Sequence, residues 1–194
     1  MKRFLFILIL LLSNFLSAQK SYKINTVSWI FKAPKNYVAK ADNFEKAVKV
    51  GEEYLKKEEN IESFSTDDVV LLTLEKEDSS PNVIMVSYKN NSSIQDHTLN
   101  GYANIVREML LRNANHDYPD AENSVINEEI TIDKITFNVV KQNSFFKDKN
   151  YLATKYFYIA EIDNKEFTIV VVNTNEEDRK NAVKSILDSK FIIK

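Results

Sequence analysis

Few residues of this sequence are suited to acid–base, nucleophilic or metal chemistry. It contains two histidines and no cysteine, which excludes thiol nucleophiles, cysteine-ligated zinc and iron–sulfur clusters. The histidines, His97 and His116, flank one predicted helix and would lie about 30 Å apart at 1.5 Å per residue. We therefore expect neither a shared metal ion nor a catalytic dyad. No G-x-S-x-G element supports a serine hydrolase either.

The densest group of possible metal ligands is the segment 116–122, HDYPDAE. Its oxygen donors would favour calcium or manganese, and its imidazole would favour zinc. The four donors are His116, Asp117, Asp120 and Glu122. Their spacing matches neither an EF-hand nor H-E-x-x-H. We predict a solvated connecting loop here, with no specific metal, and no cofactor elsewhere.

Two adjacent phenylalanines, Phe145 and Phe146, are the candidates for partner binding. They stand in a polar segment, 141–150, which we expect to be a loop between two strands. Because side chains alternate along an extended chain, the two rings cannot easily bury on one face. They either pack onto the edge of the sheet or form an exposed aromatic contact for a partner.

Composition excludes further classes of function. With only two glycines, Gly51 and Gly101, the chain cannot form a glycine-rich phosphate loop. A formal net charge of −2 argues against nucleic acid as the main partner. The adjacent acids Glu128 and Glu129 would alternate faces on a strand and do not form a glycosidase pair, although a pair distant in sequence remains open.

The first eighteen residues have the pattern of a secretory signal peptide. Lys2 and Arg3 precede an apolar run, and Ala18 provides a small residue at the expected cleavage position. The alternative, an uncleaved membrane anchor, would need an apolar stretch of ~20 residues. We predict an exported protein, periplasmic or secreted, with no stable membrane span after cleavage and one domain over 19–194.

Hydrophobic periodicity and turn residues predict three helices and a series of strands. The helices are expected to begin after the caps Asp42, Asp96 and Asn175, and Asp163-Asn164 is expected to form a two-residue hairpin turn. The expected helices are 42–59, 96–113 and 175–189; the expected strands are 21–33, 69–75, 82–88, 124–132, 135–142, 151–162, 167–172 and 191–193.

The strand 151–162 is apolar on both of its alternating faces. Such a strand is usually covered by helices on both sides. The connections are too short for parallel crossovers, so the strands must be mostly antiparallel. The fold class that follows is α+β, a three-layer α/β/α sandwich with a mostly antiparallel central sheet.

The order of elements resembles the PsbP-like α/β/α fold, which is shared by photosystem PsbP proteins, a Ran-binding nuclear import factor and the bacterial protein DcrB. The residues that carry the resemblance are SWIFKAPKNY at 28–37, ITIDKIT at 130–136 and the predicted helix before Phe191. Members mostly assist assembly or bind protein partners and share no catalytic residues. The resemblance therefore implies a fold and transfers no site residue.

The resulting hypothesis is a non-catalytic envelope protein that binds a protein partner or assists assembly. Two alternatives stay open: a hydrolase that uses carboxylates alone, and a carrier of a small ligand or lipid. A deep pocket with convergent acids would favour the enzyme, whereas a shallow surface with exposed aromatic residues would favour the binding protein.

Overall fold

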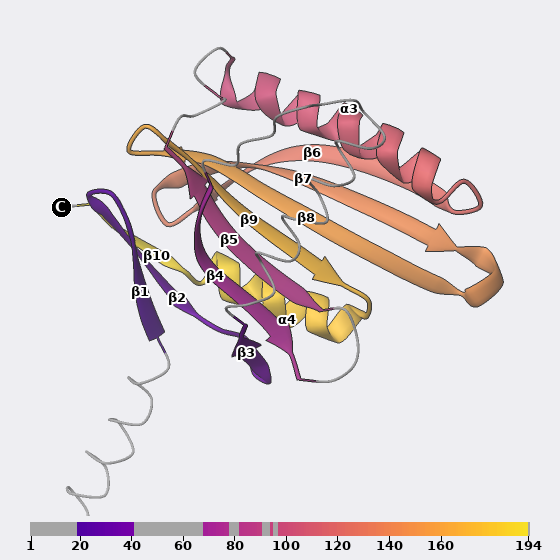
Figure 1. Cartoon of the computed structure of the whole chain (residues 1–194), viewed down its shortest axis with the longest axis horizontal. Helices are drawn as coiled ribbons and strands as arrows, with labels where there is room; N and C mark the ends of the chain where they lie inside the picture. Colours follow the sequence, from indigo (N-terminus) through magenta and orange to yellow (C-terminus); the bar gives the residue numbers. More distant parts are fainter. Residues whose placement is uncertain (1–18, 41–67, 78–81, 91–93, 95–96, 194) are drawn as a thin grey trace, which may run out of the picture.

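The computed structural model describes residues 19–40, 68–77, 82–90, 94 and 97–193. The predicted signal peptide, 1–18, and the predicted helix 42–59 lie outside these residues. The described part contains two antiparallel sheets and two α-helices (Figure 1). This agrees with the predicted α+β class and mostly antiparallel strands.

The larger sheet has seven strands in the order β3-β4-β5-β9-β8-β7-β6, all paired antiparallel. The predicted strand pairs β4/β5, β6/β7 and β8/β9 are confirmed by their antiparallel pairing. The short connection within each pair favours this arrangement. The strands are β3 (Tyr37–Ala39), β4 (Asp68–Lys76), β5 (Val83–Lys89), β6 (Glu122–Ile132), β7 (Ile135–Phe146), β8 (Tyr151–Ile162) and β9 (Lys165–Asn173).

The hairpin turns depend on residues that tolerate the left-handed conformation. Asp163 and Asn164, with φ of 52° and 59°, form the predicted two-residue turn between β8 and β9. Asp133 has φ 56° in the turn between β6 and β7. Asn25, with φ 52°, divides the single strand expected at 21–33 into a hairpin. The expected single strand was therefore wrong at this point.

This hairpin belongs to a second sheet, of three strands, that the sequence pattern did not indicate. Its order is β1-β2-β10, with β1 at Gln19–Ile24, β2 at Val27–Lys32 and β10 at Lys190–Ile193. Trp29 of β2 is fully buried and stacks on Phe31 with 4.6 Å between ring centroids. Its ring also meets Phe167 of the larger sheet edge-on, and this contact joins the two sheets.

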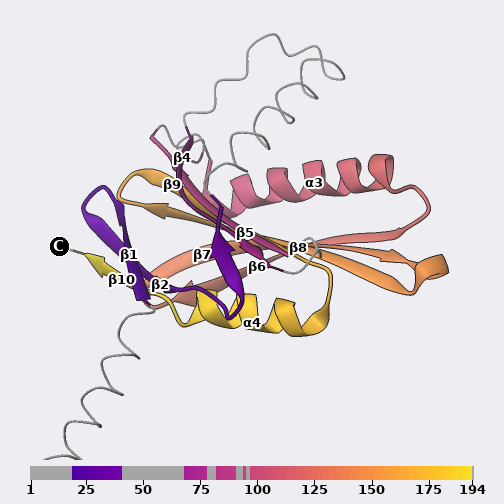
Figure 2. The same ribbon diagram turned by 60° about the horizontal axis from the view of Figure 1, so that its bottom comes forward.

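The two described helices lie on opposite faces of the seven-stranded sheet (Figure 2). Helix α3 (Leu99–Asp117) packs on β6, β7 and β8, and α4 (Glu176–Leu187) packs on β9 and β2. Asn175 caps α4 as predicted, because its side chain accepts from Asp178 N. The cap of α3 is Thr98; the predicted cap, Asp96, lies outside the described residues.

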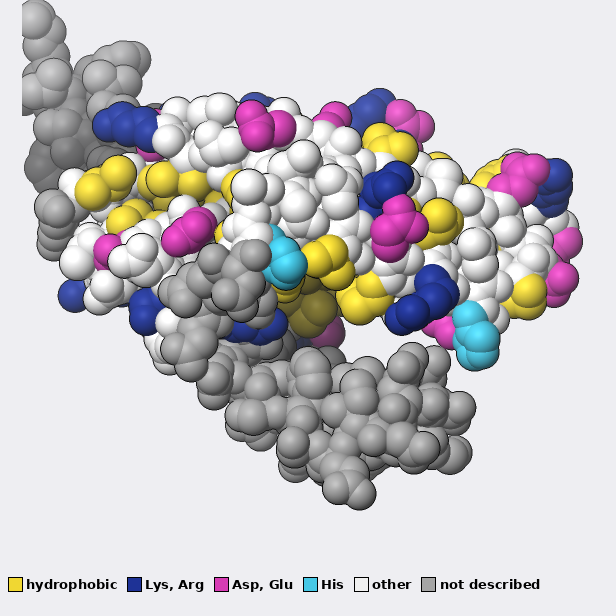
Figure 3. All heavy atoms as spheres, turned by 90° about the horizontal axis from the view of Figure 1, so that it is seen from above, with side chains coloured by type: hydrophobic (Ala, Val, Ile, Leu, Met, Phe, Trp, Pro, Cys, Tyr) yellow, Lys and Arg dark blue, Asp and Glu magenta, His cyan; other side chains and the backbone are white. Residues whose placement is uncertain are grey.

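Strand β8 contributes to both sides of the core, as its sequence predicted. Tyr158, Ala160 and Ile162 join the large cluster that faces α4 and the small sheet. Ile159 joins a smaller cluster beneath α3. The outer side of α3 carries acidic, basic and hydrophobic side chains interspersed (Figure 3). Within the described ranges, no helix is long and apolar enough to cross a membrane.

Candidate partner-binding site

The structure places Phe145 and Phe146 on opposite faces of the larger sheet. They lie in β7, which continues to Phe146, so the loop expected from 143 was wrong. The reason is pairing: Phe145 opposes Leu152 and Phe146 opposes Tyr151, so strand β8 extends the ladder beyond the predicted end. The two phenylalanines therefore do not form one contact, and each has a separate environment.

Phe146 lies on the side of the sheet that bears α3 and packs within an aromatic group. Its ring lies 5.6 Å from that of Tyr118 and 5.9 Å from that of Tyr151. The Lys149 ammonium lies 5.9 Å from the centroid of the same ring. Edge-to-face packing of this kind joins the end of α3 to the end of the β7–β8 hairpin. We therefore interpret Phe146 as a structural residue.

Phe145 lies on the other side of the sheet, within a surface that we call the distal face. Residues that are paired in antiparallel strands point to the same side of the sheet. The register therefore places Ile126 of β6, Lys141 of β7 and Tyr156 of β8 in one row, on the same side as the Phe145–Leu152 pair. Ile126 is 50% exposed and Leu152 is 38% exposed. The distal face consists of Ile126, Lys141, Phe145, Leu152 and Tyr156.

Among the described elements, α4 does not extend over the Phe145–Leu152 end of the distal face, because α4 is shorter than the strands on which it lies. The ends of β7 and β8 extend past α4 in both ribbon views (Figures 1 and 2). Arg179 of α4 marks the boundary, since its Nη1 donates to Thr154 Oγ1 at 3.3 Å. Thr154 Oγ1 in turn donates to Asn143 Oδ1 at 3.2 Å. In the register, this polar row lies between the Lys141–Tyr156 pair and the Phe145–Leu152 pair, so it crosses the distal face.

One cation and one aromatic ring of this surface are in contact, and a buried ring supports them. Lys141 Nζ lies 5.6 Å from the centroid of the Tyr156 ring, within range of a cation–π contact. Tyr156 stacks on Tyr158, with 6.1 Å between centroids. Burial raises the pKa of the Tyr158 phenol, and the nearby Tyr156 and Glu128 raise it further. Tyr158 is therefore a neutral, buried support, while Tyr156 and Lys141 are half-buried and Tyr156 also packs against the core.

The possible metal ligands at 116–122 do not converge. His116 and Asp117 belong to the last turn of α3 rather than to a loop, and their side chains form an exposed pair at 3.2 Å. Glu122 pairs instead with Lys147, and Asp120 is exposed in the turn before β6. In the described ranges, no three His, Cys, Asp or Glu side chains form a group suited to a metal ion.

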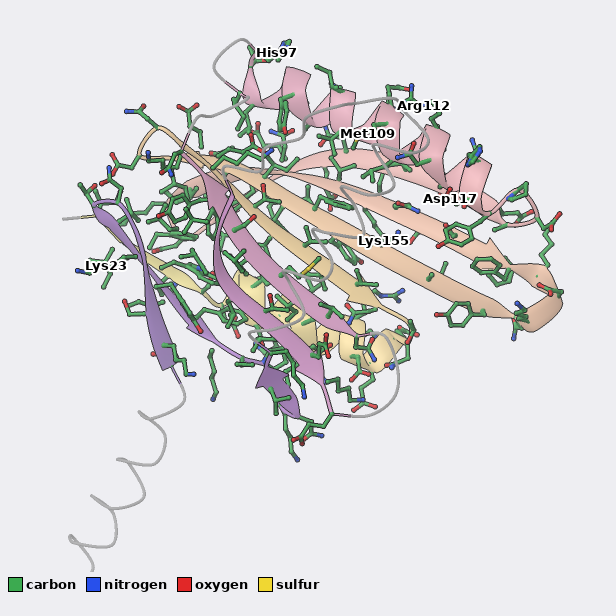
Figure 4. The ribbon with its side chains drawn as sticks, viewed as in Figure 1. Lys23, His97, Met109, Arg112, Asp117 and Lys155 are labelled. Carbon is green, nitrogen blue, oxygen red and sulfur yellow. The ribbon has the colours of Figure 1, made fainter. Side chains whose placement is uncertain are left out.

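The other histidine is remote from these residues. His97 precedes α3, and Figure 4 shows it at the opposite end of the helix from Asp117. This separation agrees with the spacing expected from the sequence.

A second candidate region is an open hollow of about 540 Å³ beside the first turn of α4. Its principal carboxylate, Asp178, is 7% exposed and accepts from Lys76 Nζ at 2.8 Å and Asn82 Nδ2 at 3.0 Å. Asn82 Oδ1 accepts in turn from Asn173 Nδ2 at 3.2 Å. The hollow is lined by Lys35, Asn36, Lys76, Asn175, Glu176, Glu177, Asp178 and Asn181.

One acid of this hollow, Glu176, is held in its charged form by a neighbouring donor. A hydrogen bond from Lys180 and its charge lower the pKa of the exposed Glu176 carboxyl. A general acid near neutral pH needs the opposite shift. Asp178 is occupied by the bonds that connect α4 to β4 and β5. These contacts are typical of a structural network.

Sequence reasoning proposed Phe145 as a candidate but did not propose the other four residues of the distal face. The available signal was the alternation along β7, in which Lys141, Asn143 and Phe145 follow the buried Phe137 and Val139 on one side of the strand. The sequence does not show where α4 begins relative to β7, so it could not show that these residues lie at the surface.

Comparison with known proteins shows the fold. No protein-family profile and no curated protein sequence matches the chain. The solution structure of cyanobacterial PsbP from Synechocystis sp. PCC 6803 matches with a TM-score of 0.50, at 14% sequence identity and over 88% of each chain. The chain therefore has a PsbP-like fold.

Proposed function

We propose that this chain is an exported, non-catalytic accessory protein that binds a protein partner through the distal face. The observation that carries the proposal is the exposed surface of Ile126 and Leu152 beside the half-buried Phe145, Lys141 and Tyr156. Aromatic and aliphatic side chains next to one cation are typical of the centre of protein interfaces. The PsbP-like structural neighbour supports an accessory role.

The carboxylate-dependent hydrolase is the weaker hypothesis. The two buried carboxylates of the described residues, Glu166 and Asp178, lie on opposite sides of the larger sheet. Tyr102 Oη of α3 donates to Glu166 at 3.0 Å, whereas Asp178 belongs to the network beside α4. Two carboxylates separated by a sheet cannot act on one bond. The hollow also has a charged lining, which does not suit a lipid.

A photo-crosslinking residue tests the proposal in cells of the source organism. It is placed at Leu152 on the distal face and, as a matched control, at Met109, which is 44% exposed on α3 (Figure 4). We expect one discrete protein adduct from Leu152 and none from Met109. Equal labelling from the two positions, or no adduct from Leu152, would contradict the proposal.

Separate serine substitutions distinguish contact from folding. Phe145→Ser should reduce the Leu152 adduct at least fivefold with little change in melting temperature, because Phe145 is only half-buried and belongs to neither core cluster. Phe146→Ser should lower the melting temperature instead, because it removes the packing with Tyr118. Turnover of a small substrate that is lost in a folded Glu166→Gln or Asp178→Asn variant would refute the non-catalytic role.

A further inference from the structure

Strand β6 is a long, regular edge of the larger sheet. It has eleven residues, ENSVINEEITI, without proline, glycine or a bulge. Among the described strands it pairs with β7 alone (Figure 1). The opposite edge, β3, has three residues. Edge strands are usually short or interrupted because their free backbone groups accept another strand.

The hairpin turn determines which backbone groups of β6 point outward. Ile132 and Ile135 flank the two-residue turn, so this pair exchanges backbone hydrogen bonds across the hairpin. The alternate residues then direct their N–H and C=O away from β7. These residues are Asn123, Val125, Asn127, Glu129 and Thr131.

The side chains beside this edge are acidic and apolar. Strand β6 contains three glutamates and no lysine or arginine. Glu122 is paired with Lys147, whereas Glu128 and Glu129 are exposed near the middle of the strand. Ile126 and Ile130 lie on the side of the distal face, and Ile126 is 50% exposed. The opposite side lies beneath α3 and presents Asn127, which donates to Asn100 Oδ1.

We propose that β6 accepts an extended basic segment of a partner protein as an additional antiparallel strand. The segment places apolar side chains beside Ile126 and Ile130 and lysine or arginine beside Glu128 and Glu129. Backbone bonds supply affinity, and the alternating side chains supply specificity. A second copy of this chain fits less well, because it would bring two sets of glutamates together. The inference rests on the proposed function and names the chemistry of the partner.

A synthetic peptide provides the probe. The acetylated, amidated peptide Thr-Val-Lys-Lys-Thr-Val-Thr matches residues 131 to 125 in antiparallel order, with valine beside Ile130 and Ile126. In a ¹H–¹⁵N NMR titration of the protein without its first eighteen residues, we expect saturable shifts centred on β6. Shifts centred elsewhere, or none, overturn the proposal.

Methylation of single peptide nitrogens isolates the backbone contribution. N-methylation of the third residue removes a donor that faces β6 and should weaken binding at least tenfold. N-methylation of the fourth residue removes a donor that faces away and should change binding less than threefold. Equal effects would show that no strand is added. A peptide with glutamate in place of both lysines should bind at least tenfold less tightly, and added salt should reduce this difference.

Variants of the protein test the same edge. Glu129→Pro removes one outward N–H, and proline is tolerated at such edge positions; binding should fall at least tenfold. Glu129→Gln keeps the N–H and should reduce binding less. If Glu129→Pro does not fold, the methylated peptides decide the question. Concentration-dependent dimerisation that is centred on β6 and blocks the peptide would overturn the proposed occupant.

The results separate this inference from the proposed function. Adducts from Leu152 without peptide binding would refute strand addition and leave the accessory role in place. Peptide binding at β6 without adducts from Leu152 would refute the distal-face interface and support the edge alone.

Discussion

Asp178→Asn tests whether the polar network beside α4 stabilises the fold. All three side-chain donors, from Lys76, Asn82 and Asn175, bond to the same atom, Asp178 Oδ2. The Lys76 and Asp178 side chains are 19% and 9% exposed, so solvent screens the ion pair weakly. Asparagine has the same shape, and its amide oxygen can occupy the position of Oδ2. The substitution therefore removes the charge and preserves the geometry.

The expected loss of stability follows from these contacts. A hydrogen bond to a charged group contributes about 1.5–3 kcal/mol and a neutral one about 1 kcal/mol, so three donors lose roughly 3 kcal/mol together. The substitution also removes the favourable interaction between the Asp178 charge and the dipole of α4, which contributes about 0.5 kcal/mol. Relief of the desolvation of a buried charge offsets part of this sum. We expect a net decrease of about 2 kcal/mol in the free energy of unfolding.

Urea denaturation followed by circular dichroism measures this change. For a domain of this size, about 2 kcal/mol lowers the melting temperature by roughly 4–8 °C. Glu177→Gln is the control, because Glu177 is an exposed carboxylate in the same turn, and only the loss of about 0.5 kcal/mol from the helix dipole is expected. If Asp178→Asn is as stable as the wild type, the network does not stabilise the fold. Asp178 would then become a candidate functional group of the hollow.

Two further predictions concern a helix cap and a turn. Thr98→Ala should destabilise the protein by about 1 kcal/mol in urea, because Thr98 Oγ1 accepts from Gly101 N at 3.1 Å; Thr98→Ser should retain most of this stability, and equal losses would refute the cap. Thr26 donates two bonds to Asp163 Oδ2, and these bonds lower the pKa of the Asp163 carboxyl. The stability that these bonds contribute is therefore fully present above the pKa that Asp163 has in the unfolded chain. It is lost as the pH falls through the lower pKa that Asp163 has in the folded protein. The difference in stability between wild type and Asp163→Asn should disappear in strong acid, and a difference that does not depend on pH would contradict this account.

Local signals predicted the elements whose partners are adjacent in sequence. The turn at Asp163-Asn164 between two apolar, strand-forming segments was sufficient to pair β8 with β9. Asn175 was sufficient to start α4. The connection after Gln142 was misjudged because a polar sequence resembles a loop, whereas β7 there is paired on both sides, with β6 and β8.

The three-stranded sheet shows what local signals could not predict. Strand β2 pairs with β10, which brings Trp29 opposite Phe191. These residues are far apart in the chain, and no turn residue marks their pairing. The contact forms because Phe191, Phe137 and Phe167 pack together in the core, with 5.9 Å and 6.0 Å from Phe191 to the other two rings.

The sequence alone determined the strand-rich α+β class, the antiparallel hairpins, the resemblance to the PsbP-like fold and the absence of cysteine and glycine-loop chemistry. Periodicity and turn chemistry are properties of neighbouring residues, so they can be read without coordinates. Only the tertiary structure decided that Phe145 and Phe146 lie on different faces, that α4 does not extend over the Phe145–Leu152 pair, and that β6 is a long strand paired with β7 alone among the described strands. Each of these facts depends on how far one element extends beside another, and that extent is set by packing between residues distant in the chain.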